Sequence, residues 1–205
     1  MARAAIIDYG LCNLDSIRRA IELCEVSAVV ISNPDSLKAA DYLILPGVGS
    51  FGVAMENLKS EGMDQAIHER VRAGTPLLGI CLGMHLLGTS SEEGGHFRGL
   101  DIIPGEVVLL RERLDDERVP HIGWNTVAAR EGEDGLLDTI PPETDFYFVH
   151  SYHFKCTQED HVVAYTPYCG GFASIVRREL VVGTQFHPEK SQGAGQRLLK
   201  SFLKQ

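Results

Sequence analysis

The sequence of 205 residues lacks the features that mark several classes of protein. No run of Lys or Arg exceeds a pair and the formal net charge is -9, which argues against a surface for nucleic acid or anionic lipid. No stretch approaches the ~18 consecutive apolar residues of a membrane span. The N-terminal residues carry no apolar signal-peptide core. We therefore expect a cytoplasmic protein that binds neither nucleic acid nor membrane.

Cysteine is also sparse, and its pattern excludes two further classes. Five cysteines make an odd number, they lack the spacing of a disulfide framework, and no C-x-x-C pair occurs. His150 and His153 could suggest a metal pair, but side chains at i and i+3 of a strand point to opposite faces. The sequence therefore predicts free thiols in a reducing compartment, with no metal ion and no other cofactor.

The first half of the chain alternates strand-like and helix-like patterns. Helical spacing begins at Leu14, a short helix opens near Asn33, and Met63–Ala73 predicts a helix that ends at Gly74. Apolar runs predict strands, the third of them ended by Pro46-Gly47, at Ala4–Ile7, Ser27–Ile31, Tyr42–Leu45 and Leu77–Ile80. This alternation predicts a central, mostly parallel sheet with helices on both faces.

The second half has a different character. Residues 99–178 contain short runs rich in Val, Ile, Tyr and Phe, separated by Gly, Pro and charged turns. This pattern predicts hairpins and additional antiparallel strands, and a helix returns only at about Ala194–Leu203. No linker, repeat or low-complexity stretch divides the chain. We expect one α/β domain over residues 1–205.

The stretch G-I-C-L-G, residues 79–83, is typical of a nucleophile on a tight turn. A strand-to-helix elbow strains the nucleophile's backbone and leaves no room for side chains on its neighbours, so Gly79 and Gly83 suit Cys81 in that role. The positive end of a following helix would favour the thiolate. The alternative is a small, buried, inert thiol, and a nearby base would decide between the two.

The stretch Q-F-H-P-E-K, residues 185–190, supplies a candidate base. The residue before a proline favours an extended conformation, in which side chains two apart project to the same side. His187 and Glu189 would then face one direction, and a carboxylate on one imidazole nitrogen leaves the other for a thiol. The alternative for an isolated His-Pro-Glu is a polar surface turn.

The glycine-rich stretch 47–52 has two interpretations besides a tight turn without chemistry. It matches the dinucleotide pattern G-x-G-x-x-G, but it follows the third predicted strand and no acidic strand end lies about twenty residues later. The preferred interpretation is an oxyanion site, with backbone N–H groups of Gly47, Val48 and Gly49 aimed at a developing negative charge. The N–H of Leu82 would give a further donor.

Taken together, these motifs resemble class I, triad-type glutamine amidotransferases. P-G-V-G-S-F-G, G-I-C-L-G-M and Q-F-H-P-E-K-S occur in that family's order and approximate spacing, and the resemblance covers nearly the whole chain. It implies that Cys81 is the nucleophile, His187 the base and acid, and Glu189 the orienting carboxylate. It further implies that Glu93 faces the ammonium group of glutamine and that Ser151 and Tyr152 hold its α-carboxylate end.

A narrower resemblance concerns one branch of this family. D-Y-G at residues 8–10, P-H-I-G-W-N at 120–125 and F-Y-F-V-H-S-Y at 146–152 are similar to the glutaminase subunits of imidazole glycerol phosphate synthases. This implies a heterodimer in which ammonia passes to a (β/α)8-barrel cyclase subunit of histidine biosynthesis. Trp124, Asn125 and Lys190 would lie at the partner face, although a lone Trp is also often a core anchor. Because such a domain takes about the whole chain, we expect the acceptor chemistry on another chain.

Two positions depart from the pattern. This branch usually has glutamine where the chain has His85, and glycine where it has Cys12. His85 and Cys81 are i and i+4, so His85 either substitutes for a substrate-binding amide or adds a group that titrates near its ordinary pKa of ~6.5. Three alternative functions stay open. They are a paralogous ammonia supplier in surface-sugar biosynthesis, a stand-alone cysteine hydrolase and a non-catalytic binding module.

Overall fold

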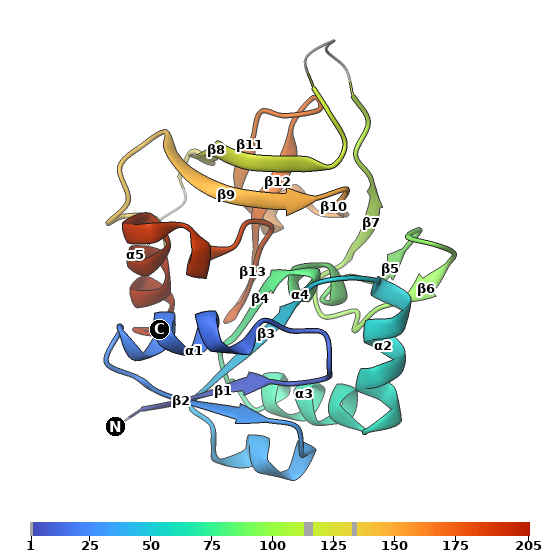
Figure 1. Ribbon diagram of the computed structural model, residues 1–205, viewed down its shortest axis with the longest axis vertical. Helices are drawn as coiled ribbons and strands as arrows, with labels where there is room; N and C mark the ends of the chain where they lie inside the picture. The colour runs from blue at the N-terminus through green and yellow to red at the C-terminus, as the bar shows by residue number, and fades with distance from the viewer. Residues whose placement is uncertain (1, 113–116, 133–134) are drawn as a thin grey trace.

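The computed structural model describes residues 2–112, 117–132 and 135–205 and is built around a nine-stranded sheet (Figure 1). Five neighbouring strands are parallel, in the order β2 (Ser27–Ile31), β1 (Arg3–Ile7), β3 (Tyr42–Gly47), β4 (Leu77–Cys81) and β13 (Val181–Thr184). Antiparallel strands continue the sheet as β12 (Phe172–Arg178), β11 (Val162–Thr166), β8 (His121–Ala129) and β9 (Thr144–His150).

A second sheet of four strands lies beside this one. Its order is β10 (Tyr152–Cys156), β7 (Gly105–Leu109), β5 (Ser90–Ser91) and β6 (Phe97–Arg98). Only Ser151 separates β9 of the first sheet from β10 of the second, so the chain changes sheets at that corner.

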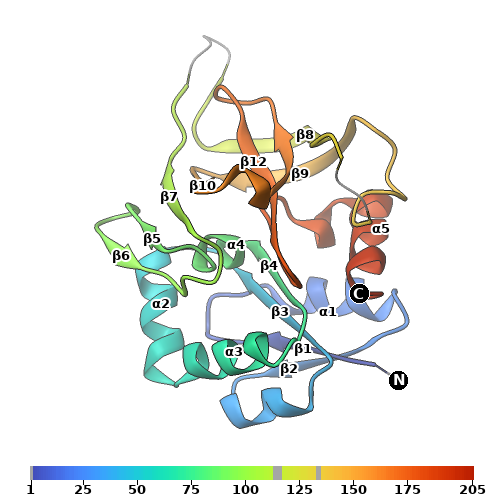
Figure 2. The ribbon, with the colours of Figure 1, turned by 180° about the vertical axis from the view of Figure 1, so that it is seen from behind.

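Helices cover both faces of the parallel strands, as Figures 1 and 2 show from opposite sides. The helices are α1 (Leu14–Glu22), α2 (Phe51–Ser60), α3 (Met63–Arg72), α4 (Leu82–Leu86) and α5 (Gln192–Phe202), with 3-10 turns η1 (Pro34–Ala39), η2 (Glu159–His161) and η3 (Pro188–Lys190). None of the helices in the described part of the chain is long and apolar enough to cross a membrane.

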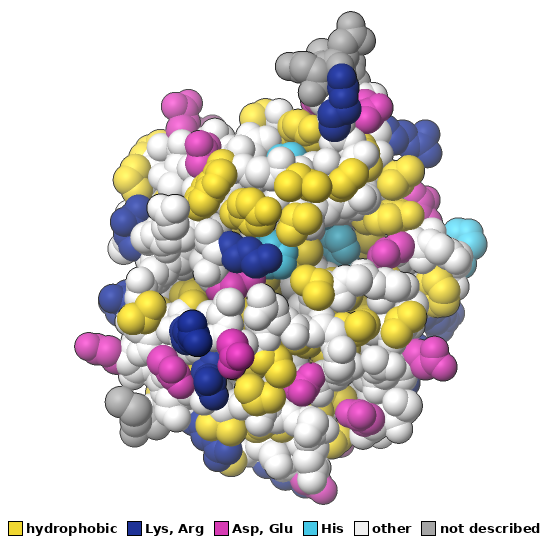
Figure 3. All heavy atoms as spheres, viewed as in Figure 1, with side chains coloured by type: hydrophobic (Ala, Val, Ile, Leu, Met, Phe, Trp, Pro, Cys, Tyr) yellow, Lys and Arg dark blue, Asp and Glu magenta, His cyan; other side chains and the backbone are white. Residues whose placement is uncertain are grey.

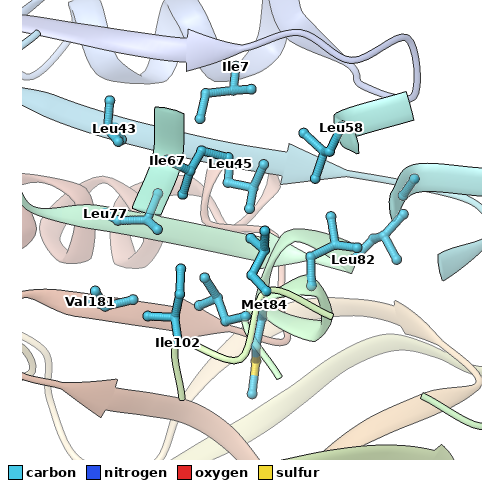
Figure 4. Packing of buried hydrophobic residues seen from close by; sticks show 14 of the residues in the cluster. Ile7, Leu43, Leu45, Leu58, Ile67, Leu77, Leu82, Met84, Ile102 and Val181 are labelled. Atoms are coloured by element: carbon cyan, nitrogen blue, oxygen red, sulfur yellow. The ribbon is translucent and has the colours of Figure 1, made fainter. Parts of the chain in front are cut away.

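Successive side chains of the parallel strands point to opposite faces of the sheet, and each face has its own hydrophobic core. Ile7, Leu43 and Leu45 pack with α2, α3 and α4 on one face (Figure 4). Ile6 and Ile44 point to the other face, where they pack with α1 and α5. Because both faces are buried, these strands are continuous apolar runs, and the prediction of a parallel sheet flanked by helices is confirmed.

The predicted end of the third strand at Pro46-Gly47 was wrong, because β3 continues through both residues. The pairing explains how a proline is accommodated there. β1 pairs with β3 only as far as Ile44, while β4 pairs with it up to Gly47. The missing N–H of Pro46 therefore costs no ladder hydrogen bond with β1.

Candidate functional site

The three motifs singled out in the sequence meet where parallel strands end. Gly47 of β3 is the register partner of Cys81 of β4, and Thr184 of β13 is the partner of Ile80. The glycine loop, the cysteine turn and the His-Pro-Glu segment therefore leave the same edge of the sheet side by side. This carboxyl edge is where α/β sheets place their ligands.

Cys81 lies on a strained turn between β4 and α4. Its φ of 54° and ψ of -108° are unusual for a residue with a side chain. A Cβ on Gly79 would lie 2.7 Å from the Gly83 carbonyl oxygen, and one on Gly83 would lie 1.7 Å from the Leu45 carbonyl oxygen. Both glycines are thus required by close packing of backbone, as the elbow interpretation predicted.

His187 and Glu189 form a buried pair. His187 Nδ1 lies 2.8 Å from Glu189 Oε1, and only 4% and 2% of the two side chains are exposed. The predicted path was partly wrong, because residues 188–190 form the 3-10 turn η3 rather than an extended strand. The backbone is held where it enters this turn, since His187 N–H donates to the Tyr147 carbonyl and Ser191 Oγ donates to the His187 carbonyl.

The pair changes the acid–base behaviour of the histidine. Burial alone would lower the pKa of His187, but its interactions with the nearby Cys81 and with the Glu189 carboxylate outweigh burial and raise the pKa to about 9. Nδ1 faces the carboxylate, while Nε2 is buried and has no partner among the described residues. The Cys81 thiol instead donates to the Val149 carbonyl at 3.8 Å. No other described group therefore competes with the nearby Cys81 for Nε2.

A pocket of 280 Å³ opens in front of the thiol. Its walls bring together Cys81 and Leu82 from the elbow with four other residues that the sequence predicted as substrate-binding, namely His85, Glu93, Ser151 and Tyr152. Val48 and Gly49 from the glycine loop, and Val149 and His150 from the end of β9, complete the lining. Its size suits a small polar metabolite.

The glycine loop is held in a specific conformation. Val48 N–H donates to the Leu11 carbonyl at 2.9 Å, so this donor is occupied, whereas the predicted oxyanion geometry needs it free. The Pro46 carbonyl accepts from Tyr9 Oη at 2.6 Å and lies 3.5 Å from Cys12 Sγ. Leu82 starts α4, so its N–H has no acceptor within the helix.

Glu93 reaches the pocket from the segment after β5. Its Oε2 accepts from the Phe51 N–H at 3.2 Å, at the start of α2. Burial raises the pKa of its carboxyl, and the Phe51 N–H partly opposes that rise. The carboxylate thus faces the pocket with one oxygen held by backbone, which suits recognition of an ammonium group.

Of the two alternatives for His85, titration near pH 6.5 is the one that the structure contradicts. The His85 ring is buried, and burial lowers its pKa to about 4, with only partial compensation from a hydrogen bond to Gln185. His85 Nε2 lies 2.8 Å from Gln185 Oε1. His85 is therefore neutral at physiological pH and lines the pocket as a polar ring.

Residues predicted at a partner face divide into two groups. Trp124 is 49% exposed and contacts the Tyr147 ring edge-on, and Lys190 Nζ lies 5.8 Å from the same ring. Hydrophobic side chains form a band over β8 and β9 at this place (Figure 3). Asn125 is different, because its side chain binds His121 and the backbone of Thr126.

Sequence reasoning missed three residues that shape this site. Leu11 holds the glycine loop, Gln185 holds His85, and Val149 accepts from the Cys81 thiol. Gln185 is the first residue of the stretch Q-F-H-P-E-K, so a sequence signal for it exists. The other two act through backbone carbonyls, which leave no side-chain signal. No cluster of metal-ligating side chains was found in the described ranges.

The fold and the site indicate a class of protein, and a comparison with known protein families indicates the same class. Residues 5–205 match the family model Glutamine amidotransferase class-I. The chain belongs to the class I glutamine amidotransferase family.

Individual relatives indicate a particular branch of this family. The chain is similar to imidazole glycerol phosphate synthase subunit HisH 2 of Nitrobacter winogradskyi, at 44% identity over 99% of this chain and 98% of the relative. It is also similar to subunit HisH of Moorella thermoacetica, at 46% identity over 98% and 94%. HisH of Geobacter metallireducens is 41% identical over 98% of both chains.

Solved structures share the fold. The structure of PurLQS from Thermotoga maritima has a TM-score of 0.77 at 17% identity, covering 99% of this chain and 98% of that one. A glutamine amidotransferase crystal structure has a TM-score of 0.76 at 18% identity, covering 98% of this chain and 97% of that one. The predicted fold class is confirmed.

Proposed function

We propose that this protein is the glutaminase subunit of an imidazole glycerol phosphate synthase. It hydrolyses glutamine to glutamate and ammonia and supplies the ammonia to a (β/α)8-barrel cyclase subunit, which makes imidazole glycerol phosphate and an aminoimidazole carboxamide ribotide. The observation that carries this is Cys81, on a strained turn facing the pocket, with the buried His187–Glu189 pair beside it. Full-length identity of 41–46% to HisH subunits supports the assignment.

In the first step, the Cys81 thiolate, whose proton is on His187, attacks the carbon of the glutamine side-chain amide. A C–S bond forms and the carbonyl electron pair moves onto oxygen, where backbone N–H groups stabilise the charge. His187 donates a proton to the departing nitrogen as the C–N bond breaks, which releases ammonia and leaves a thioester. The raised pKa of His187 keeps that proton available at neutral pH.

In the second step, His187 acts as a base. It takes a proton from water, the resulting hydroxide attacks the thioester carbon, and the C–S bond breaks to release glutamate and regenerate the thiolate. Glu189 holds the imidazole through Nδ1 in both steps. The carboxylate of Glu93 pairs with the substrate ammonium, and the Ser151–Tyr152 corner holds the α-carboxylate end.

The partner surface is proposed at Ile122, Trp124, Tyr147 and Lys190. Ile122 is 61% exposed, and an aromatic pair with an adjacent lysine is the composition expected of an interface centre. Tyr147 also connects this surface to the active site, since its carbonyl accepts from the His187 N–H. The proposed single domain of residues 1–205 is supported by a sheet whose strands come from both halves of the chain.

The decisive experiment measures glutamate release and imidazole glycerol phosphate formation with and without the cyclase subunit of the same organism. We expect the partner to accelerate glutamate release and to use the ammonia. Equal glutamate release without the partner would instead indicate a stand-alone hydrolase. Glutamate release without ammonia use by the cyclase would favour a paralogous supplier in surface-sugar biosynthesis.

A further inference from the structure

Two buried histidines link an asparagine on β8 to the wall of the pocket. Asn125 Nδ2 lies 3.1 Å from His121 Nε2, His121 Nδ1 lies 3.0 Å from His150 Nε2, and His150 Nδ1 lies 2.9 Å from the Tyr152 carbonyl oxygen. We refer to these four groups as the histidine chain. His121 and His150 are register partners on β8 and β9, so their side chains share one face of the sheet.

Asn125 would be too far from His121 in a regular strand, where residues four apart are separated by about 13 Å. Gly123 lies between them with φ of 135°, outside the regular strand conformation. The backbone departs from a regular strand there, and the two side chains come within hydrogen-bond distance. A φ of this size favours glycine, which is the residue found there.

The chemistry of the end groups fixes the direction of every bond. The Tyr152 carbonyl can only accept, so His150 must carry its proton on Nδ1 and present a lone pair at Nε2. His121 must then donate from Nδ1 and accept at Nε2. Asn125 completes the chain, because its Oδ1 accepts from the Thr126 N–H at 2.8 Å and leaves Nδ2 as the donor.

The surroundings keep both rings neutral. His121 stacks on Tyr168 with ring centroids 4.1 Å apart, and His150 meets the Phe172 ring edge-on at 4.9 Å. Burial lowers the pKa of His121 to about 4 and that of His150 well below its ordinary value. A neutral imidazole has one donor and one acceptor, which is what a one-directional chain needs.

The end of the chain lies at the corner between the two sheets. His150 and Tyr152 flank Ser151, and all three line the pocket beside Cys81. The ring of His150 bonds across this corner to the Tyr152 carbonyl. We propose that the histidine chain positions the Ser151 corner for glutamine binding, an inference that rests on the proposed glutaminase function. Asn125, His121 and His150 are thus positioning residues.

The first test reads the protons directly and needs no activity. Nitrogen-15 NMR of imidazole rings distinguishes Nδ1–H, Nε2–H and doubly protonated histidine, and His121→Gln and His150→Gln assign the two signals. At neutral pH the full chain should show both rings neutral with the proton on Nδ1. A proton on Nε2 of either ring, or a charged ring, would overturn the proposal whether or not the protein is a glutaminase.

The second test separates positioning from general stability. His150→Gln keeps one donor and one acceptor, whereas His150→Phe has neither. We expect His150→Phe to raise the KM for glutamine about fivefold, as for one lost hydrogen bond, while kcat changes less than about twofold and His150→Gln recovers most of the loss. His153→Phe, at a neighbouring histidine that also approaches Phe172, is the matched control and should leave KM unchanged.

Equal KM values for His150→Phe and His150→Gln, or the same rise in His153→Phe, would contradict the proposal. If His150→Phe does not fold, Asn125→Asp keeps the test decisive. A carboxylate at position 125 accepts where the amide donates, so His121 must gain a proton on Nε2. An unchanged NMR signal for His121 in that variant would also contradict the proposed direction of the hydrogen bonds.

Discussion

The Val48 N–H donates to the Leu11 carbonyl at 2.9 Å, although Val48 lines the pocket with Cys81. An oxyanion donor at Val48 therefore requires this bond to break and the peptide to turn toward the pocket. The glycines on either side make such a turn possible, since Gly49 already has φ of 102°. In this structure the proposed oxyanion donor is therefore engaged in another hydrogen bond.

Replacement of Val48 by proline tests the donor. The variant lacks the N–H that donates to Leu11 in this structure and that is proposed to stabilise the oxyanion. We expect kcat in the presence of the cyclase subunit to fall about 10²–10³-fold, as for loss of one oxyanion donor. Val48→Ala keeps the N–H and is the control. A Val48→Pro enzyme as active as Val48→Ala would show that this N–H takes no part.

Glu189→Gln should change the pH dependence of the reaction. The raised pKa of His187, about 9, keeps the imidazolium available until the pH passes that value, so kcat should decline on the alkaline side near pH 9. Removal of the carboxylate charge lowers the pKa of His187 and moves that decline to lower pH. The measurement is a kcat profile for both proteins, and coincident alkaline limbs would contradict the role of Glu189.

Buried neutral histidines should make stability sensitive to acid. Burial lowers the pKa of His85, His121 and His150, to about 4 for the first two. Between about pH 6.5 and about pH 4 these histidines bind protons in the unfolded chain but stay neutral in the folded chain. The free energy of unfolding therefore falls as pH falls. The slope is about 1.4 kcal/mol per pH unit for each such histidine.

Urea unfolding across that range measures the slope. His85→Gln removes one contributor and should flatten it, whereas His96→Gln alters an exposed ring and should leave it unchanged. The same slope in all three proteins would mean that His85 does not resist protonation in the folded state.

The elbow glycines should tolerate no side chain. A Cβ on Gly83 would lie 1.7 Å from the Leu45 carbonyl oxygen, which belongs to the rigid backbone of β3. Gly83→Ala should lower the free energy of unfolding by about 1–3 kcal/mol or more and reduce kcat, because the elbow must shift. Gly193→Ala is the control, because a Cβ there meets only Arg197 Nη1, at an ordinary 3.7 Å. Comparable losses in both variants would show that the clash at Gly83 is not their cause.

The sequence predicted the parallel core and the three motif segments because strong local signals specify them. Continuous apolar runs mark strands buried on both faces, and G-x-C-x-G marks the elbow through sterics that the structure reproduces at Gly79 and Gly83. The family resemblance was confirmed by the match over residues 5–205. The catalytic roles assigned to Cys81, His187 and Glu189 stay predictions.

Other features could not be read from local pattern. Three features depend on residues that are distant in sequence and become neighbours only in the fold. They are the turn at Pro188–Lys190, the hydrogen bond of Val48 to Leu11 and the neutral state of His85. Asn125 is a further example. Its place in P-H-I-G-W-N suggested the partner face, but its hydrogen bond to His121 could not be predicted from the sequence. Periodicity predicts faces and elements, but hydrogen-bond partners across strands follow from register.

The most direct test of the central claim is to treat the protein with an electrophilic glutamine analogue and locate the adduct by mass spectrometry. Cys12 and Cys156 are internal controls, because burial raises the pKa of these thiols to about 11 and about 12 and so disfavours the reactive thiolate. We predict one adduct, on Cys81, which glutamine prevents and Cys81→Ser abolishes. An adduct only on another cysteine, or none on Cys81, would contradict covalent glutamine hydrolysis at this site.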